Sequence, residues 1–518
     1  MLKRALRVIL SKTFAFAVLI VLQIVFFCML LYWLANYAAL IYTPLTIVTA
    51  LVLVAVLEQD DLNPAYKLMW ILIIVLMPLF GTLFYVLWGH RTVPRRKRRV
   101  LQEIETRTST AMTQDPKVIE QLELDDPCLG QSARYLLNHA SSPLYPGGEG
   151  EYYPLGEDFF PRFLDTIRAA KKFIFMEYYI YEEGYMLDTT IEVLRQKAAE
   201  GVDVRVMWDG FGSLFTLPPD FKHKLDTYGI KCHPFSPITL SVHLSDYAML
   251  NHRDHRKITV VDGVIGFSGG LNFADEYINL KERFGQWKDN SFMVRGEAVF
   301  TLTTTFLRLW DFASGTVSNL DDYRPAPDAP APLSLERGYV QPYWDSPLDR
   351  ENVSENAYLN VIRHAKDYVY ICTPYLILDH EMITSLTLAA KSGVDVRILT
   401  PGIPDKPTVF LVTQSYYPVL LAGGVRIYEY TPGFNHAKMY VSDHRTAIIG
   451  SANMDYRSLY LHFENCVSFY GGQMVAEAHN DMLDCFDKAH EVTLEETRNI
   501  PFGRRLVQIV AKFFAPML

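Results

Sequence analysis

Three long apolar runs make up the N-terminal part of the chain. They are Phe14 to Leu34, Ala38 to Leu57 and Leu68 to Trp88, and Gln23 is the only clearly polar residue of the first. A helix rises about 1.5 Å per residue, so the first run is long enough to cross a hydrocarbon core about 30 Å thick. Further apolar runs after the first disfavour a cleavable signal peptide. We therefore expect residues 1–92 to form a retained, multi-pass transmembrane anchor.

Charged residues around the apolar runs leave the topology open. Basic residues flank the region on both sides, namely Lys3, Arg4, Arg7 and Lys12 before it and Arg95 to Arg99 after it. Both flanks favour the cytoplasmic side, which requires an even number of crossings. Either one apolar run is re-entrant or interfacial, or one flank breaks the rule. We expect a cytoplasmic catalytic region.

The hydrophobic pattern changes after the anchor and then repeats. The first copy comprises Ile167 to Ile180 and Ala198 to Met207, and the second comprises Ile362 to Leu376 and Ala389 to Leu399. Each copy is typical of a helix, a strand rich in β-branched and aromatic residues, a second helix and a second strand. That order predicts an α/β fold with a mostly parallel sheet in each half.

The repeat suggests where the domains divide. We expect a polar connector over residues 93–130, a first half over 131–324 and a second half over 334–518. The segment between the halves, residues 325–333, contains four prolines in Pro325-Ala-Pro-Asp-Ala-Pro-Ala-Pro332 and is typical of a surface linker.

Composition removes some classes of function. The 49 basic side chains are outnumbered by 58 acidic ones, for a net charge of −9. That balance lacks the basic excess of proteins that neutralise many nucleic-acid phosphates, so we expect no nucleic-acid partner. The six cysteines have no metal-ligand spacing and do not predict a disulfide framework.

One chemical motif occurs twice. His255, Lys257 and Asp262 match His436, Lys438 and Asp443 in spacing, and each set continues with Gly at +14 and Asn at +17. A single match arises by chance too often to decide anything, and an isolated histidine is often a core residue. Two matches in register inside a duplication are strong. Since side chains alternate along a strand, we expect His and Lys of each motif to face one shared substrate.

These residue types suit displacement at a phosphodiester. A neutral imidazole attacks phosphorus, and a protonated one gives its proton to the leaving oxygen. Positive charge and neutral donors then stabilise the non-bridging oxygens. The candidates for binding or orienting the substrate are Lys257, Lys438, Asn272, Asn453 and Ser451. No divalent metal and no cofactor are required by this chemistry.

Two further carboxylates are candidates for orienting the histidines. Asp289 in Trp287-Lys-Asp289 and Glu464 in His462-Phe-Glu464 suit a hydrogen bond to the far imidazole nitrogen. We expect Asp262 and Asp443 to brace the motif strand and turn instead. Glu177 could line the pocket. The remaining histidines, including His90, His252, His380, His444 and His462, have no repeated partner and are interpreted as structural.

The paired motifs, together with Gly450-Ser-Ala-Asn-Met-Asp-Tyr-Arg-Ser458, resemble the phospholipase D superfamily. Within it the chain is similar to bacterial cardiolipin synthases along nearly its whole length. The resemblance implies N-terminal transmembrane helices followed by two similar α/β/α halves around a pseudo-twofold axis. It also implies location in the bacterial plasma membrane, although the family pattern more often suggests two apolar runs than three.

The resemblance further implies a two-step transfer. One phosphatidylglycerol gives its phosphatidyl group to a histidine and releases glycerol, and a second phosphatidylglycerol accepts the group to form cardiolipin. We expect His255 as nucleophile and His436 as general acid and then base, although the motifs are nearly symmetric. The partners are then phosphatidylglycerol and membrane lipid, and oligomeric state and acyl-chain preference stay open.

Three alternatives remain. The same residues with water as acceptor would make a phospholipase D or a membrane-bound nuclease, and a chain without turnover would be a lipid-binding protein. The C-terminal tail from Arg504 to Lys512 combines basic and apolar residues. It suits either the membrane interface or packing onto the core.

Overall fold

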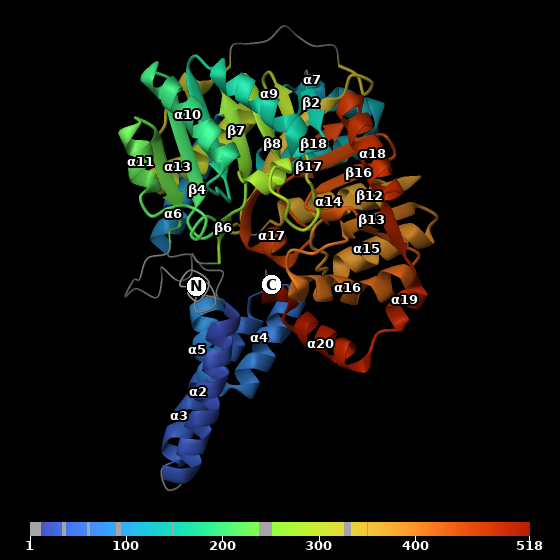
Figure 1. The fold of residues 1–518 in the computed structure, drawn as a ribbon. Helices are drawn as coiled ribbons and strands as arrows, with labels where there is room; N and C mark the ends of the chain where they lie inside the picture. The colour runs from blue at the N-terminus through green and yellow to red at the C-terminus, as the bar shows by residue number, and fades with distance from the viewer. Residues whose placement is uncertain are drawn as a thin grey trace. The chain divides into compact units, whose positions relative to one another are not determined.

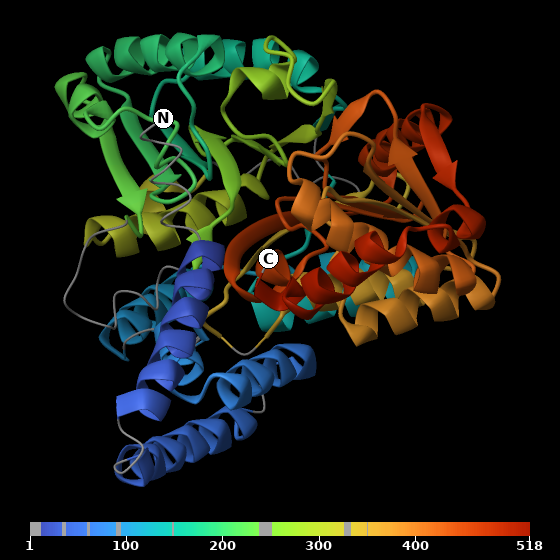
Figure 2. The ribbon, with the colours of Figure 1, turned by 60° about the horizontal axis from the view of Figure 1, so that its bottom comes forward.

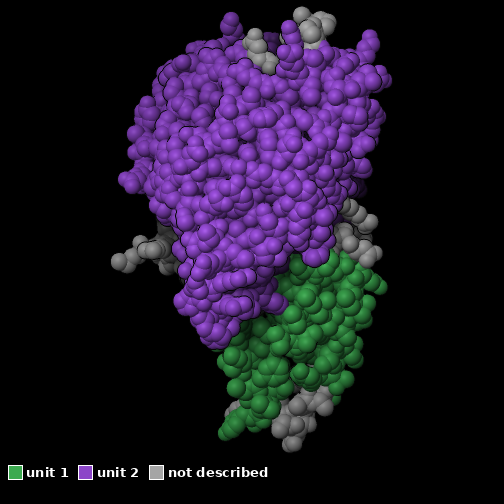
Figure 3. Space-filling view, turned by 90° about the vertical axis from the view of Figure 1, so that its right-hand side faces the viewer, with its two compact units in different colours: residues 1–94, 239–251, 517 green, residues 95–238, 252–516, 518 purple. Residues whose placement is uncertain are grey.

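The computed structural model describes residues 12–33, 38–59, 63–89, 95–147, 150–237, 251–325, 333–349 and 351–517. The chain divides into two compact units, coloured separately in Figure 3. The smaller unit comprises residues 1–94, 239–251 and 517, and the larger comprises residues 95–238, 252–516 and 518. Most of the Pro-rich linker, the basic residues Lys3, Arg4 and Arg7, and His90 lie outside the described residues.

The smaller unit is helical. Its elements are α2 (Lys12–Trp33), α3 (Ala38–Leu57), α4 (Pro64–Leu76), α5 (Pro78–Phe84) and the π-helical turn η1 (Tyr85–Gly89). The first two apolar runs coincide with α2 and α3. The third apolar run is divided among α4, α5 and η1, because Pro78 cannot donate a helical hydrogen bond and α4 ends at Leu76.

The helices α4 and α5 pack closely against each other on the two sides of this break. A Cβ atom on Gly81 of α5 would lie 2.5 Å from the carbonyl oxygen of Ile73 in α4, so only glycine permits the observed approach. Over the part of this unit that the structure describes, no helix is both long and apolar enough to cross a membrane.

The larger unit contains two mixed sheets. The first has the order β2-β10-β8-β7-β3-β4-β5. Its strands are β2 (Gly150–Tyr153), β3 (Phe173–Tyr178), β4 (Asp203–Asp209), β5 (Lys231–Phe235), β7 (Lys257–Val261), β8 (Ile265–Gly269) and β10 (Ser291–Arg295).

The second sheet has the order β1-β11-β18-β17-β16-β12-β13-β14-β19, and β6 (Arg253–Asp254) pairs with β18 beside this path. Its other strands are β1 (Tyr145–Pro146), β11 (Tyr339–Asp345), β12 (Tyr368–Cys372), β13 (Asp395–Pro401), β14 (Arg426–Tyr430), β16 (Met439–Ser442), β17 (Thr446–Gly450), β18 (His462–Tyr470) and β19 (Ala489–Val492). A separate pair joins β9 (Gln286–Lys288) to β15 (Gly433–Asn435).

The duplication in the sequence is a duplication of structure. The order β8-β7-β3-β4 in the first sheet matches β17-β16-β12-β13 in the second, and the central pairs β3 with β4 and β12 with β13 are parallel. The strands β3 and β12 are buried along their whole length. Two similar α/β halves are therefore confirmed, shown in green and in orange to red in Figure 1.

Helices cover the faces of these sheets, as Figure 2 shows for the first half. The first half contains α9 (Gly156–Arg168), α10 (Tyr185–Ala199), α11 (Phe221–Thr227), the turn η2 (Asp275–Ile278), α13 (Val299–Ser314) and the turn η3 (Leu320–Tyr323). The second contains α14 (Val353–His364), α15 (His380–Lys391), α16 (Pro407–Ala422), α17 (Tyr456–Tyr460), α18 (Gly472–Asp487), α19 (Leu494–Arg498) and α20 (Phe502–Phe513).

Residues before the first half contact both halves. Helix α6 (Arg95–Thr110) packs against α13 of the first half, where Arg107 forms an ion pair with Asp311, whereas α7 (Pro116–Asp125) and α8 (Pro127–Ala140) pack with the second half. Leu122 of α7 and Leu129 of α8 share a core with Tyr339 of β11, and β1 pairs with β11 as well. The expected division at residue 131 therefore differs from the packing, because α8 and β1 cover the sheet of the second half.

The aspartates of the two motifs lie in tight hairpin turns. Asp262 and Gly263 both have positive φ between β7 and β8, and Asp443 and His444 do so between β16 and β17. Two successive residues of this kind are typical of a type I′ turn, which matches the twist of the flanking strands. Each aspartate thus lies at the far end of its strand from the motif lysine, about 16–17 Å away at strand rise.

Each aspartate also fastens its hairpin to the neighbouring strand. The Asp262 carboxylate accepts hydrogen bonds from the backbone N–H groups of Lys171, Lys172 and Phe173, at 2.8, 2.7 and 3.0 Å. Asp443 accepts the three equivalent bonds before β12, at 2.8 to 3.0 Å. The fold therefore uses these carboxylates to hold the start of β3 and of β12.

Replacing Asp262 by alanine should destabilise the first half. The change leaves three backbone donors without their acceptor, at a cost of about 1–3 kcal/mol. We expect the apparent Tm of the larger unit to fall by a few degrees. Asp262→Asn keeps one acceptor oxygen and should lose less. An alanine variant that melts with the wild type in a thermal scan would contradict this role.

Candidate active site

Each motif histidine is supported by the opposite half of the larger unit. The strand β6, which precedes His255, pairs in parallel with β18, and the His255 N–H donates to the Phe463 carbonyl at 2.9 Å. The strand β15, which precedes His436, pairs in parallel with β9, and the His436 N–H donates to the Lys288 carbonyl at 2.7 Å. Each motif histidine therefore lies in surroundings that the opposite half completes. We call this the exchanged arrangement.

This arrangement differs from the expectation that the His and Lys of each motif alternate along one strand. The strand β7 begins at Lys257 and β16 begins at Met439, so both histidines lie outside the long strands. The physical reason is that the backbone of each histidine hydrogen-bonds to the other half and not to its own sheet.

The carboxylates come from the opposite half as well. The two Glu464 oxygens lie 2.9 and 3.0 Å from Nδ1 of His255, and Asp289 Oδ2 lies 2.6 Å from Nδ1 of His436. Both carboxylates are fully buried. An Nδ1–H donated to a carboxylate fixes ring and tautomer and leaves Nε2 for a reacting atom. The structure therefore brings these four predicted residues into two pairs.

The two lysines lie against the same histidines. Lys257 Nζ donates to the His255 carbonyl, and Lys438 Nζ donates to the His436 carbonyl and lies 3.1 Å from the His436 Nε2. Burial lowers the pKa of Lys257 to about 7 and that of Lys438 to about 8, although the nearby carboxylates act in the opposite direction. The site therefore concentrates positive charge that an anion would neutralise.

The same surroundings keep both imidazoles neutral. Burial, with the Lys438 charge next, lowers the pKa of His436 to about 4, and Asp289 opposes this. Burial and the charges of Lys257 and Lys438 hold the pKa of His255 well below its usual range. A bound anion would raise both values, because opposite charge favours the protonated ring.

The two asparagines and the serine are placed differently from one another. Asn272 accepts from the Ile180 N–H at 3.2 Å and donates to the Tyr277 hydroxyl at 2.8 Å. Asn453 donates to Asp455 at 3.0 Å, and its buried Oδ1 has no hydrogen-bond partner among the described residues. Ser451 donates its hydroxyl proton to Glu464, so it positions the carboxylate.

A small residue faces each orienting carboxylate. A Cβ atom on Gly270 would lie 2.1 Å from Asp289 Oδ1, so a side chain at this position would collide with the carboxylate. The equivalent position in the second half is Ser451, whose hydroxyl bonds to Glu464. Both halves thus supply a carboxylate with a small residue facing it. The first half uses Asp289 and Gly270, and the second uses Glu464 and Ser451.

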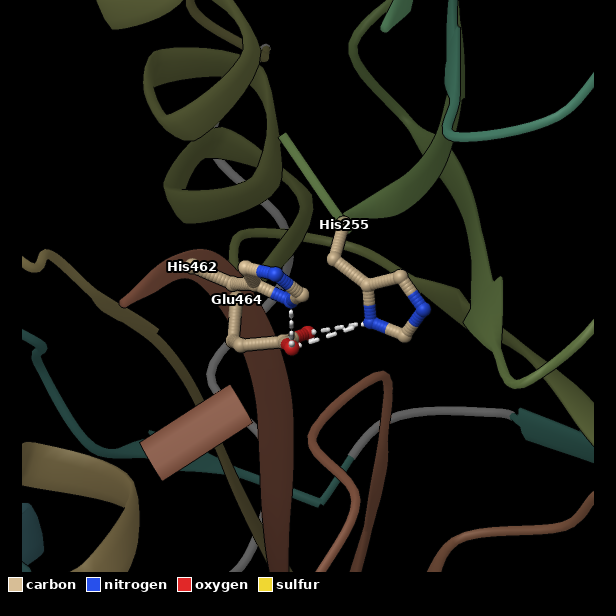
Figure 4. Close-up of side chains that lie close together, drawn as sticks. All are labelled: His255, His462 and Glu464. Atoms are coloured by element: carbon tan, nitrogen blue, oxygen red, sulfur yellow. Dashed lines mark hydrogen bonds and ion pairs between the residues drawn. The ribbon is translucent and has the colours of Figure 1, made fainter. Parts of the chain in front are cut away.

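His462 also belongs to this cluster, although it was interpreted as structural. Figure 4 shows its ring beside Glu464 and His255, and its Nδ1 lies 3.7 Å from Glu464 Oε1. It begins β18 two residues before Glu464, so both side chains point to one face. The alternation of His462 and Glu464 along one strand could have identified His462 from the sequence. It was not identified because His462 has no counterpart in the first half.

His255, His462 and Glu464 offer ligand atoms within 4.8 Å of one another, which is metal-ligand spacing. The hydrogen bonds oppose such use. Arg457 donates to His462 Nε2 at 3.3 Å, so the nitrogen facing Glu464 carries the proton in the neutral ring. His255 and Ser451 occupy the Glu464 oxygens, and Lys257 and Lys438 add positive charge.

Glu177 does not line the site. It is fully buried and forms an ion pair with Arg256, the residue between His255 and Lys257, while Arg256 also contacts Asp254. Burial raises the pKa of Glu177 well above its usual range, and Arg256 opposes the rise. The equivalent residues in the second half are neutral: Cys372, Asn435 and Ala437, with a Cys372 to Asn435 hydrogen bond of 3.1 Å. The two motifs thus rest on chemically different supports.

Comparisons with known proteins identify the family of the chain. A family profile described as cardiolipin synthase, PLD-like domain, matches residues 358–485, and one described as phospholipase D-nuclease N-terminal matches residues 45–90. A cardiolipin synthase of Alkalihalophilus pseudofirmus is 33% identical over 89% of this chain and 90% of its own length. One of Geobacillus thermodenitrificans is 34% identical over 89% and 91%.

The chain is also similar to one further relative and to one solved structure. An uncharacterized protein of Streptococcus mutans is 40% identical over 89% of this chain and 98% of its own length. Among solved structures, the phosphatidylserine synthase of Haemophilus influenzae is similar, with a TM-score of 0.57 and 16% identity over 75% of this chain and 98% of that chain. At this identity the structural likeness shows the fold alone.

Replacing Lys438 by methionine should raise the pKa of His436. Lys438 is the charge that lowers this pKa most, and methionine keeps the bulk of the side chain while removing the charge. The titration can be followed by NMR on histidine-labelled protein, with His436→Asn to assign the signal. The exposed Lys488→Met is the matched control. An unchanged or lower pKa in Lys438→Met would show that this electrostatic account of the site is wrong.

Proposed function

The chain belongs to the cardiolipin synthase family of the phospholipase D superfamily, and we propose that it makes cardiolipin and glycerol from two molecules of phosphatidylglycerol. The observation that carries the proposal is the exchanged arrangement of the two histidines. Each imidazole has its Nδ1 beside a buried carboxylate, and two buried lysines lie next to the rings, with Lys438 Nζ 3.1 Å from His436 Nε2.

In the first step His255 Nε2 attacks the phosphorus of phosphatidylglycerol. The bond from phosphorus to the glycerol oxygen breaks, and His436 gives that oxygen a proton, so glycerol leaves and a phosphatidyl-histidine remains. In the second step His436 takes the proton from a hydroxyl of another phosphatidylglycerol. That oxygen attacks phosphorus, the bond to His255 breaks, and cardiolipin leaves. The enzyme returns to its starting protonation state.

The remaining predicted residues then act on charge and orientation. Lys257 and Lys438 bind the non-bridging oxygens, and Asn272 and Asn453 add neutral donors there. Asp289 and Glu464 orient the rings and stabilise the imidazolium form. The phosphodiester anion itself helps, because its approach raises the pKa of His436 and so allows that ring to carry the proton for glycerol.

The substrate is a membrane lipid, so we propose that the N-terminal helices hold the enzyme at the plasma membrane. The support is the apolar composition of α2 and α3 and the family profile that matches residues 45–90. Nucleic acid is not proposed as a partner. Transfer to water in place of a lipid hydroxyl, as in a phospholipase D, is the alternative reaction of the same site.

Purified enzyme given phosphatidylglycerol alone should release cardiolipin and glycerol in equal amounts. His255→Ala and His436→Ala should each reduce turnover by about a thousandfold or more, because one ring attacks and the other transfers protons. The products can be separated by chromatography. His380→Ala, an exposed histidine on α15, is the control and should retain wild-type turnover.

Two outcomes would contradict this assignment. Phosphatidic acid without cardiolipin would show that water is the acceptor. Activity that is lost in EDTA and restored by added metal would contradict the two-histidine mechanism, because that mechanism uses no metal.

The pH dependence should reveal the two lysines. Their pKa values are lowered to about 7 and about 8, so they are charged below these values and lose charge as pH rises. His436 must carry a proton, and its pKa is lowered to about 4, so kcat/KM already declines above that pH, and we expect the loss of lysine charge to steepen the decline between pH 7 and about 9, since kcat/KM reports the free enzyme. An ordinary lysine, with a pKa near 10.4, would delay the steepening until above about pH 10. A slope that stays unchanged up to that pH would rule out the proposed role of the lowered lysine pKa values.

A further inference from the structure

The last helix presents its apolar side outward. The single buried side chain in α20 is that of Gln508, which is 6% exposed, whereas Phe502 and Ile509 are 81% and 61% exposed. Leu506, Val507 and Val510 are exposed too. A helix on the surface of a globular core normally has the reverse arrangement, with apolar residues inward and polar residues outward.

Four of the exposed residues and the half-buried Phe513 form one stripe. At about 100° per residue, the side chains of Phe502, Leu506, Ile509, Val510 and Phe513 fall within an arc of about 100°, and Gln508 points to the opposite side. Contiguous exposed apolar surface of this kind marks a contact with a partner or a membrane. We call these five residues the apolar stripe of α20.

Polar contacts fix the helix in this orientation. The Arg504 guanidinium donates to Gln414 of α16 at 2.7 Å, and Lys512 Nζ lies 4.0 Å from the centre of the Tyr416 ring on the same helix. Figure 1 shows α20 beside α16. The basic side of α20 is therefore tied to the core of the larger unit, and this turns the apolar stripe away from it.

The charge of α20 indicates what the apolar stripe contacts. Arg505 is exposed beside the stripe, and Arg504 and Lys512 flank the buried Gln508, whereas the chain as a whole has a net charge of −9. A helix that inserts apolar residues into the acyl boundary and carries basic residues on its polar face is typical of membrane interfaces. Basic residues near an anionic leaflet are attracted to it. A protein partner would not require a basic polar face.

The position of α20 relates the stripe to the candidate active site. The helix α16 follows directly on Lys406, an exposed lysine whose charge acts on His255. Gln414 and Tyr416 lie about 12–15 Å further along α16 at helical rise. Helix α20 therefore packs on α16 within a few helical turns of this lysine.

We propose that the apolar stripe of α20 inserts into the interface of an anionic bilayer and holds the catalytic unit against the membrane that contains its lipid substrate. This contact is separate from the N-terminal helices and serves docking. The identity of the substrate rests on the proposed function, but the docking itself does not.

A fluorescent label tests the position of the stripe. Full-length protein with Cys28 and Cys128 replaced by serine receives an environment-sensitive dye at Ile509→Cys and is reconstituted into phosphatidylglycerol vesicles containing brominated lipid. The matched control is Leu388→Cys on α15, which is 62% exposed in the same unit. We expect quenching at position 509 and none at 388. A dye at 509 that the lipid does not quench would overturn the proposal, as would disulfide cross-linking between two unlabelled copies of the Ile509→Cys variant.

Kinetics give an independent readout. The double variant Leu506→Asp and Ile509→Asp changes exposed side chains only, so it should fold like the wild type. We expect a severalfold higher KM for phosphatidylglycerol in vesicles and an unchanged rate with a short-chain monomeric substrate, while Leu388→Asp alters neither. Equal losses on both substrates would contradict docking. Lipid quenching at 509 without cardiolipin formation would refute the proposed function and leave the docking proposal intact.

Discussion

The structure of the larger unit depends on keeping two buried carboxylates paired with imidazoles from the opposite half. A buried carboxylate without a hydrogen-bond donor is strongly unfavourable, and removing the donor from a buried acceptor costs about 1–3 kcal/mol, and more for a charged one. Asp289 and Glu464 are both fully buried, so each half must supply a partner for the other. The parallel pairs of β6 with β18 and β9 with β15 hold the backbones where these contacts form. Neither half contains a complete site.

The contacts next to these carboxylates also join the two halves. Asn465, next to Glu464, accepts the backbone N–H of Lys257 at 3.1 Å and donates to Ser268, so the second half also fixes the start of β7. The hairpins that carry Asp262 and Asp443 then hold β7 and β16 at their far ends. The motif is therefore a strand held at both ends, with its histidine at one end and its aspartate at the other.

The sequence was sufficient for the parts that depend on local pattern. The duplication predicted two α/β halves, because buried strands and amphipathic helices leave periodic signals. The spacing within the motifs selected His255 and His436. The pairing of α8 and β1 with the second half could not be predicted, since strand partners far apart in the chain leave no local signal. His462 was missed because the prediction relied on repetition, and the contact at Glu464 exists in one half only. Pro78 lies inside the third apolar run, but the residue at which the preceding helix ends, Leu76, depends on packing that the local pattern does not encode.

The exchange of carboxylates also has an evolutionary reading. A single half resembling this one would have to pair with a second copy to complete a site, and its stability would then depend on concentration. Joining two halves in one chain makes that pairing intramolecular, at an effective concentration set by the connection. Once joined, the two copies no longer need to satisfy the same interface. The first half can keep Asp289 opposite Gly270 and the charged Glu177 and Arg256 pair next to His255, and the second can keep Glu464 with Ser451 and a neutral support next to His436. Covalent linkage thus allows a twofold scaffold to hold two histidines in unequal surroundings.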